Sequence, residues 1–416
     1  MSFERPGRVV ILTSHFPPET FAPAKRMAAV AAAFARKGYN VRVVAPFPHY
    51  PQRMMYEGFS GLLMKKEVAG IRVIYLRPWF YRSRHPFVRI LSEGVYSFLA
   101  FLTALALGRP RVLVVSIPFM FLAVSGLVCS AILRARYVLD VRDLTWDYLT
   151  VFKSRIVAAV GRALASMMKW AVTKADVVVT SNERQKTYVE EFRGTGSTLL
   201  HENGVDDGLF EQLNRVQTGK AAGNPVTVVY AGLLGYPQNV ATLIDALALL
   251  HADGVNVRGV IIGDGVEKSR IEERISSVSA GLVELTGYLP QDKLAAYYQT
   301  ADIFWAQLRT EPIFQTARPS KLLEYMAAGK PIVFGGQGGE AEKLIAASGS
   351  GIVVPPEHPP ILAAAIRRLM DDPAARLEFA RCGRRYASKH LRSVEADAFV
   401  ENLGHFLQPP PDSGRF

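Results

Sequence analysis

The stretch that most constrains this chain is a short helical segment between two apolar runs, at residues 319–331. The runs on either side, Ile-Phe-Trp-Ala and Pro-Ile-Val-Phe, have the length and the side chains of buried strands. Ser320 is a favoured N-cap residue, Gly329 can adopt the left-handed conformation that ends a helix, and Pro331 cannot continue one. A helix between parallel strands directs its first amides at the edge where open α/β sheets bind ligands.

Lys321 and Glu324 lie three residues apart and therefore on one face of this predicted helix. In one interpretation they form a surface ion pair worth about 0.2–0.5 kcal/mol. In the other, Lys321 binds a phosphate group and Glu324 accepts hydrogen bonds from a ribose diol. The spacing alone does not choose between the two.

The pattern Pro-Ser-Lys-x-x-Glu-Tyr-x-Ala-x-Gly-x-Pro, followed by Gly339-Glu340, resembles the donor-site segment of family-4 retaining glycosyltransferases. It is most similar to the branch that adds sugars during O-antigen, capsule and exopolysaccharide assembly, which includes L-fucosamine transferases. The resemblance implies an α/β fold of the GT-B type. Two Rossmann-like doubly wound domains would face a central cleft, and a C-terminal helix would cross back to the first domain. It extends to Arg142-Asp143 and to the Asn-Gly-Val-Asp turn at 203–206.

Length and composition agree with two folded domains. The 416 residues exceed the roughly 100–200 residues of one ordinary domain. A hydrophobic content of 49% and a net charge of +12 describe a folded protein that attracts anionic partners, and the charge does not choose among nucleic acid, lipid head groups and nucleotide sugars. Two cysteines provide neither a disulfide framework nor a metal cluster, which fits a reducing compartment. We expect no signal peptide, because the first residues lead directly into an apolar strand.

Apolar runs alternate with helical stretches, which predicts parallel sheets and sets the expected domain boundaries. We expect an N-terminal Rossmann-like acceptor-binding domain at 1–210 and a polar linker at 211–225. A C-terminal Rossmann-like domain that binds a nucleotide sugar should follow at 226–385. The helix at 386–407 should pack back on the N-terminal domain, and 408–416 should form a loose tail.

Two uncharged stretches raise the question of membrane contact. Residues 112–133 are long enough for a transmembrane helix, but Pro118 favours a strand, a loop and a helix instead. Residues 95–107 predict a buried or membrane-facing helix that is too short to span a bilayer comfortably. Residues 156–174 predict a helix with a cationic face, either packed on a sheet or lying at an anionic membrane interface.

The resemblance implies a donor site at the ends of successive strands in the second domain, where glycines would let backbone amides approach a diphosphate. The contacts that it implies are Tyr288 and Leu289 for the base, Glu324 for the ribose, and Gly232, Gly235, Gly263, Gly265, Arg318, Ser320 and Lys321 for the diphosphate.

The catalytic candidates are Arg142, Asp143, Thr316 and Lys321. Asp143 would contact the acceptor hydroxyl or the donor sugar, although its position after a strand also fits a helix N-cap. Family members often have a second glutamate eight positions before the ribose glutamate, and this chain has Thr316 there. They also often carry Arg and Lys after the first glycine-bearing strand. Because that pair is missing, the diphosphate charge must be met by Lys321 first, and then by Arg318 and Arg142.

The resemblance implies a retaining hexosyl- or N-acetylhexosaminyl-type transferase. It would be cytoplasmic, peripheral on the inner face of the cytoplasmic membrane and attracted to an anionic membrane surface. The expected donor is a nucleotide sugar, with UDP as the nucleotide, and the expected acceptor is a polyprenyl-diphosphate-linked saccharide. We expect no cofactor, no metal and no nucleic acid partner, and the sequence leaves the oligomeric state open.

Three other functions remain possible at this point. A GT-B nucleotide-sugar epimerase or a transferase with a soluble acceptor would use the same donor site. A catalytically inactive, membrane-associated scaffold would explain Thr316 and the missing Arg/Lys pair. A dehydrogenase fits less well, because the first loop lacks the glycines of a dinucleotide site.

Overall fold

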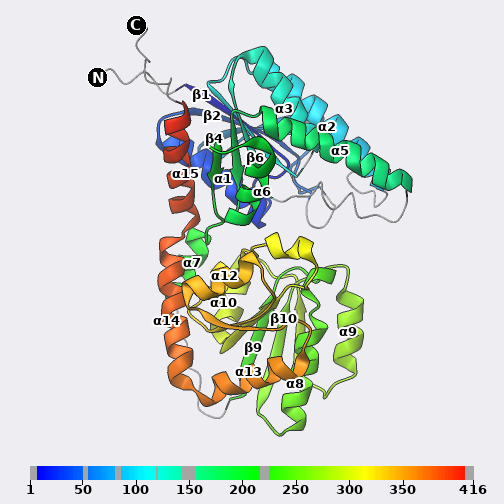
Figure 1. Cartoon of the computed structure of the whole chain (residues 1–416), viewed down its shortest axis with the longest axis vertical. Coiled ribbons are helices and arrows are strands. Elements are labelled where there is room, and N and C mark those ends of the chain that lie inside the picture. The colour runs from blue at the N-terminus through cyan, green and yellow to red at the C-terminus, as the bar shows by residue number, and fades with distance from the viewer. Residues whose placement is uncertain are drawn as a thin grey trace. The chain divides into compact units, whose positions relative to one another are not determined.

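The computed structural model describes residues 7–49, 55–79, 86–118, 120–142, 155–215 and 224–407 (Figure 1). The chain divides into two compact units. The first consists of Met1–Asn203 and Arg392–Phe416, and the second of Gly204–Leu391. Each unit has its own sheet, with a hydrophobic core on either face.

The sheet of the first unit has eight strands in the order β3-β4-β2-β1-β5-β6-β7-β8. They are β1 (Arg8–Thr13), β2 (Asn40–Pro46), β3 (Leu63–Val68), β4 (Ile71–Leu76), β5 (Val112–Ile117), β6 (Arg136–Val141), β7 (Val177–Thr180) and β8 (Thr198–Leu200). All neighbouring strands run parallel except β3 and β4. Because β1 lies inside the sheet and the chain winds outward on both sides, the strand order reverses between β1 and β5.

Helices cover both faces of this sheet. They are α1 (Ala22–Arg36), α2 (Pro86–Ala106), α3 (Met120–Leu133), α5 (Arg155–Lys174), α6 (Glu183–Arg193) and α15 (Arg392–Leu407). Successive strand side chains point to opposite faces. Val10 and Leu12 therefore join the core under α2, α3 and α5, while Val9 and Ile11 join the core under α1 and α15. Burial on both faces explains why these strands read as continuous apolar runs.

The second unit has a parallel sheet in the order β11-β10-β9-β12-β13-β14. Its strands are β9 (Val226–Ala231), β10 (Val257–Ile262), β11 (Val283–Gly287), β12 (Ile303–Gln307), β13 (Ile332–Gly335) and β14 (Gly351–Val354). Its helices are α7 (Asp207–Arg215), η1 (Tyr236–Gln238), α8 (Ala241–Ala252), α9 (Lys268–Ser276), α10 (Gln291–Thr300), η2 (Pro312–Thr316), α11 (Lys321–Ala327), α12 (Glu340–Ser348), α13 (Pro359–Asp371) and α14 (Pro373–Lys389). The strand order reverses between β9 and β12.

The observed boundary between the units differs from the expected one. Helix α7 covers part of the range 211–225 that we expected to be a linker, and residues 216–223 lie outside the described ranges. Leu209 and Leu213 are four residues apart on one face of α7 and are buried in the core of the second unit. The second unit therefore begins at Gly204, well before the expected start at 226.

The last helix, α15, belongs to the first unit although it follows the second in sequence. It begins at Arg392, six residues after the expected start at 386, because α14 continues to Lys389 within the second unit. The ring of Phe399 stacks on the ring of His201, with 4.8 Å between ring centroids. This contact and the packing of α15 against α1 close one face of the first sheet.

The two uncharged stretches have different structures. Residues 112–133 form β5 and α3 on either side of Pro118, as predicted. The helix predicted at 95–107 is longer than expected, since α2 begins at Pro86. Among the described residues, Val88–Ala106 of α2 is the one segment long and apolar enough to cross a membrane, so the prediction that it is too short was wrong.

A buried ion pair connects α1 to the residues where the chain leaves the first unit. The Nη2 atom of Arg26 donates to Asp140 Oδ1 at 3.1 Å and to the carbonyl of His201 at 2.8 Å. Both charged side chains are only 3% exposed. Ser116 Oγ donates to the other oxygen of Asp140 at 2.8 Å.

Removing one partner of this pair leaves an uncompensated buried charge. We expect Arg26→Met to lower the free energy of unfolding by about 3–5 kcal/mol. The matched control is Arg36→Met, which breaks the exposed pair with Asp397, where the side chains are 48% and 43% exposed. That change should cost less than about 1 kcal/mol. Urea denaturation at neutral pH measures both, and equal losses would contradict the assignment.

Candidate active site

Strand β9 and helix α11 meet at the carboxyl edge of the second sheet, beside the point where the strand order reverses. Gly232 follows β9 and packs directly against Lys321, the first residue of α11. A Cβ atom at position 232 would lie 2.3 Å from Lys321 Nζ, so a larger residue there would displace the ammonium group, and the φ of +145° at Gly232 itself favours glycine. Two residues of the predicted donor site are thus brought into contact.

Lys321 is held by an aromatic hydroxyl. Its Nζ donates to Tyr230 Oη at 2.8 Å and lies 4.0 Å from the centroid of the same ring. Tyr230 Oη in turn donates to the carbonyl of Leu233 at 2.6 Å, within the glycine-bearing turn after β9. Burial lowers the pKa of Lys321 to about 7, and the nearby carboxylate of Glu324 opposes that shift. An anion arriving here would stabilise the protonated form.

Glu324 is oriented by a second tyrosine. Its Oε2 accepts a hydrogen bond from Tyr298 Oη at 2.9 Å. Tyr298 is 1% exposed and packs edge-on against Phe304 and Tyr325. Since Lys321 and Glu324 each bond to a tyrosine and no ion pair joins them in this described part of the chain, the surface ion pair considered above does not form.

A third tyrosine fixes α11 to the sheet. The hydroxyl of Tyr325 accepts from the amide of Ala231 at 2.8 Å and donates to the carbonyl of Ala231 at 3.0 Å. The ring of Tyr325 stacks on Phe304 of β12, with 4.1 Å between centroids. The end of β9, the strand β12 and the helix α11 therefore form one packed unit.

Helix α11 ends where the sequence predicts, but it begins without the predicted side-chain cap. Gly329 has φ +64°, so the left-handed stop is confirmed. The prediction that Ser320 is a side-chain N-cap was wrong. Ser320 has helical backbone angles (φ −60°, ψ −26°) and makes no capping hydrogen bond with its side chain. An N-cap residue needs an extended backbone to turn its oxygen back to the first amides.

Two of the other three predicted glycines are required by close backbone packing. A Cβ at Gly263 would lie 1.9 Å from the carbonyl oxygen of Gly232, and one at Gly265 would lie 2.2 Å from that of Leu234. A Cβ at Gly235 would lie 3.0 Å from Gln238 Oε1, which is the end of a side chain. Close packing of neighbouring strand ends thus explains two of these glycines without a ligand, and their contact with a diphosphate stays a prediction.

The remaining donor candidates are spread along the same region. The Nη2 atom of Arg318 donates to Tyr386 Oη at 3.1 Å. Thr316 ends η2 and is half-buried. Tyr288 is 50% exposed after β11, while Leu289 packs against the core of the second unit. Their roles toward the donor stay predictions.

In the first unit, Arg142 lies at the end of β6 and is 9% exposed. Its Nε donates to the carbonyl of Ile117 at 2.9 Å, and its own carbonyl accepts from Ser181 Oγ at 3.1 Å. Asp143 and the rest of 143–154 lie outside the described residues.

The loop after β1 holds a pair that the sequence did not single out. His15 Nδ1 lies 2.8 Å from Glu19 Oε2, and Glu19 Oε1 accepts from the amide of His49 at 2.9 Å. Burial and the charge of Arg142 lower the pKa of His15, while Glu19 raises it. The spacing of four residues between His15 and Glu19 was the available signal.

Two families of known proteins match most of the chain. Residues 22–201 match the family described as "Glycosyl transferase 4-like domain". Residues 225–372 match the family described as "Glycosyl transferases group 1". The chain belongs to the family-4 glycosyltransferases. The resemblance to family 4 that residues 319–331 carry is thereby confirmed, and the branch stays a prediction.

Relatives of this family-4 chain include glycogen synthase from Mycobacterium tuberculosis, which is 28% identical over 230 residues, or 54% of this chain and 53% of that protein. The chain thus spans about half the length of that relative. The putative colanic acid biosynthesis glycosyl transferase WcaI from Escherichia coli is 22% identical over 77% of this chain and 81% of that protein. The structure of Anabaena HepE in complex with UDP aligns with a TM-score of 0.67 at 16% identity, over 96% of this chain and 100% of that chain. The predicted GT-B fold of two Rossmann-like units is confirmed.

The lowered pKa of Lys321 predicts a pH-dependent stability in this family-4 chain. Between pH 7 and 10.5 the unfolded lysine binds a proton that the folded one has released, so this group makes the wild type more stable as the pH rises. Lys321→Met lacks this gain. Its stability relative to the wild type should therefore be higher at pH 6 than at pH 9, by about 1–2 kcal/mol for a half-buried side chain.

Chemical denaturation at the two pH values measures this difference. The control is Lys343→Met, whose side chain is 69% exposed and should show no comparable dependence. If the free energy of unfolding of Lys321→Met differed from that of the wild type by the same amount at both pH values, burial would not lower the pKa of Lys321.

Proposed function

We propose that this chain is a retaining glycosyltransferase that moves a sugar from a nucleotide diphosphate to a lipid-linked saccharide during cell-surface polysaccharide synthesis. One observation carries the proposal. At the reversal point of the second sheet, Lys321 packs against the backbone of Gly232, and Glu324, three residues later in the same first turn of α11, is oriented by Tyr298. A cation beside a glycine turn and an oriented carboxylate are complementary to a diphosphate and to a ribose diol.

In this proposal Glu324 accepts hydrogen bonds from the two ribose hydroxyls. Its bond from Tyr298 leaves the carboxylate in one orientation, so little side-chain entropy is lost when the nucleotide binds. Lys321 faces the diphosphate across Gly232. Since α11 has only seven residues, we assign the anion contact to the ammonium group of Lys321 and to nearby cations such as Arg318.

The chemistry follows from where charge develops. As the bond between the anomeric carbon and the diphosphate oxygen breaks, negative charge grows on the leaving group. Protonated Lys321 stabilises that charge, and its burial strengthens the interaction. The acceptor hydroxyl attacks the same face of the sugar, and its proton passes to the departing oxygen. No protein nucleophile and no metal are invoked.

The first unit supplies the acceptor side in this proposal. Asp143 contacts the acceptor hydroxyl or the donor sugar, and Arg142 adds a cation beside it. Thr316, in place of a second glutamate, donates to or accepts from a sugar hydroxyl. The reacting groups are positioned by the two substrates' binding contacts, which is how proximity lowers such a barrier.

The choice of donor and acceptor rests on the relatives. The HepE structure contains UDP, and WcaI is named for colanic acid biosynthesis. We therefore propose a UDP-sugar of the hexosyl or N-acetylhexosaminyl type and a polyprenyl-diphosphate-linked acceptor. Such an acceptor would place the reaction at the inner face of the cytoplasmic membrane.

Thermal unfolding with UDP, GDP, ADP and TDP tests the donor site. We expect one nucleotide, UDP, to raise the melting temperature. Glu324→Gln should lower the affinity for UDP at least about tenfold, because a hydrogen bond to a charged group contributes about 1.5–3 kcal/mol. The matched control is Glu284→Gln. Glu284 also accepts from a tyrosine, Tyr297, at 3.0 Å, but it lies near the start of β11.

Each outcome decides between the alternatives. No shift with any nucleotide would contradict the donor site and favour an inactive scaffold. A rise in melting temperature that Glu324→Gln leaves unchanged would assign the ribose contact to another residue. A normal nucleotide shift without transfer to a lipid-linked acceptor would favour a soluble acceptor or an epimerase.

A further inference from the structure

The outward face of α2 is apolar over most of its length. Leu91, Phe98 and Leu102 follow one another at helical spacing and are 56%, 58% and 44% exposed. A surface helix ordinarily turns charged residues outward. Here the only charged residues of α2 are Arg89 and Glu93, both near its start, and Glu93 accepts from the amide of Phe121 at 3.0 Å. This surface is unusual for a helix in water.

Helix α3 extends the same surface. It contains no charged residue, and Val128 and Ile132 are 42% and 58% exposed. Helices α2 and α3 pack side by side over one core of the first unit, so their exposed sides both point away from the sheet (Figure 1). We call the exposed apolar side chains of the two helices the helix face; they are Leu91, Phe98, Leu102, Val128 and Ile132.

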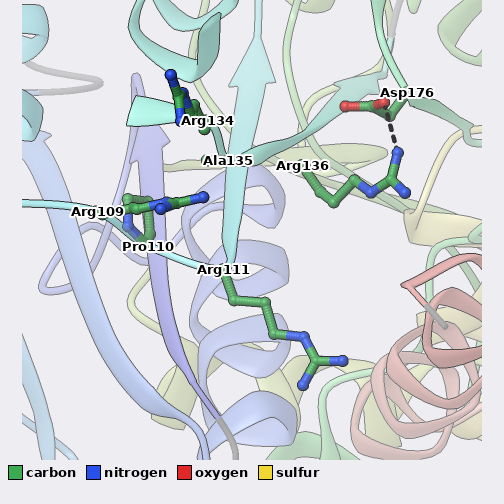
Figure 2. Close-up of a pocket in the computed structure, with 7 residues that line it drawn as sticks. All are labelled: Arg109, Pro110, Arg111, Arg134, Ala135, Arg136 and Asp176. Atoms are coloured by element: carbon green, nitrogen blue, oxygen red, sulfur yellow. Dashed lines mark hydrogen bonds and ion pairs between the residues drawn. The ribbon is translucent and has the colours of Figure 1, made fainter. Parts of the chain in front are cut away.

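A cationic hollow lies where these helices end. It has a volume of about 440 Å³ and is lined by Arg109, Pro110, Arg111, Arg134, Ala135, Arg136 and Asp176 (Figure 2). Its single acid, Asp176, pairs with Arg136 at 3.1 Å, on the side away from Arg109 and Arg134. We call Arg109, Arg111 and Arg134, for which no ion pair occurs among the described residues, the arginine cluster.

Helix dipoles account for only part of this charge. A cation after the last turn of a helix is favourable, which would explain one arginine after α2 and one after α3. On the opposite face of the same sheet, the cations at a helix end form ion pairs. At the end of α1, Arg36 pairs with Asp397 at 2.8 Å and Lys37 pairs with Glu401 at 3.6 Å. Within the described part of the chain, the arginine cluster has no such acidic partners.

We propose that the first unit docks on an anionic phospholipid bilayer, with the helix face in the interfacial layer and the arginine cluster on lipid phosphates. An apolar face alone would suit a protein partner equally well. The adjoining arginines decide for lipid, because the planar guanidinium group matches phosphate oxygens in pairs and an apolar face edged by cations suits an anionic interface.

The buried inner side of α2 determines the orientation of this helix at the membrane. The inner side of α2 buries Tyr96, Ala100 and Ala104 in the core of the first unit. Inserting α2 across a bilayer would remove these residues from that core. The helix therefore lies in the plane of the interface with its outer side about 5–10 Å deep, although its length and composition would allow a span.

The docking surface reaches both edges of the sheet. Glu93 near the start of α2 contacts the start of α3, which follows β5, so this end lies at the carboxyl edge of the strands. The arginine cluster lies at the opposite edge, before β5 and β6. The inference rests on the proposed function in one respect, that a lipid-linked acceptor would enter at the carboxyl edge. The docking itself requires no sugar transfer.

Flotation of the whole chain with vesicles tests the proposal. The vesicles contain phosphatidylcholine alone or a mixture with phosphatidylglycerol. We expect binding to the mixture, weaker binding to phosphatidylcholine, and a loss of the difference at high salt. Arg109→Gln with Arg134→Gln should weaken binding to the mixture roughly thirtyfold, at about 1 kcal/mol for each charge. Phe98→Ser with Leu102→Ser should weaken binding to both vesicle types.

The control changes equally exposed residues of the second unit. Leu377→Ser, at a side chain 72% exposed on α14, and Arg270→Gln, at one 64% exposed on α9, should leave flotation unchanged. Thermal unfolding with UDP on every variant separates the two proposals. Lost flotation with an unchanged nucleotide shift supports docking, whatever the fate of the donor site, and confirms that the variants fold.

Several results would overturn the proposal. Failure of the wild type to float with either vesicle type would do so, as would flotation of the two double variants equal to that of the wild type. Stabilisation by inorganic phosphate that needs Arg109 and Arg134, without vesicle binding, would assign the hollow to a soluble anion. A dimer in light scattering that Phe98→Ser with Leu102→Ser dissociates would assign the helix face to a second copy.

Discussion

The two hydrogen bonds between the hydroxyl of Tyr325 and the backbone of Ala231 are the contact on which the proposed donor site depends. They hold α11, through its fifth residue, against the end of β9, where the strand order reverses. With α11 fixed, Lys321 has only the space above Gly232, and Glu324 has only the hydroxyl of Tyr298. Three buried tyrosines thus convert a seven-residue helix, too short to be stable alone, into a rigid platform.

The first unit divides its chemistry between the two edges of one sheet. At the carboxyl edge, the loop after β1 carries the His15–Glu19 pair, and Arg142 follows the last residue of β6. The charge of Arg142 contributes to the lowered pKa of His15. At the amino edge, arginines gather after α2 and α3. Helices that run between these edges connect them along one apolar surface. The same parallel topology that brings strand ends together for a ligand therefore also brings helix ends together for an anion.

Much of this could be predicted from sequence. The strand–helix–strand segment at 319–331, the stop at Gly329 and the family were readable because local signals and tertiary structure agree there. Other readings did not survive: Ser320 has the right side chain but the wrong backbone angles to cap, and residues 211–215 are helical because Leu209 and Leu213 enter a distant core. The length of α2 was underestimated because the prediction used only the uncharged run at 95–107, whereas the helix begins at Pro86 and includes the charged residues Arg89 and Glu93, the latter accepting from the amide of Phe121.

By itself the sequence determined the alternation of strands and helices, the glycines at strand ends and the placement of Lys321 and Glu324 on one helix face, since all of these are properties of spacing. Only the tertiary structure decided what those two side chains contact. Tyr230 and Tyr298 come from positions 91 and 26 residues away. Only it revealed that the charges following α2 and α3 share one hollow. Such contacts join separate strands and helices, and no local pattern specifies which of many distant residues will fill a given space.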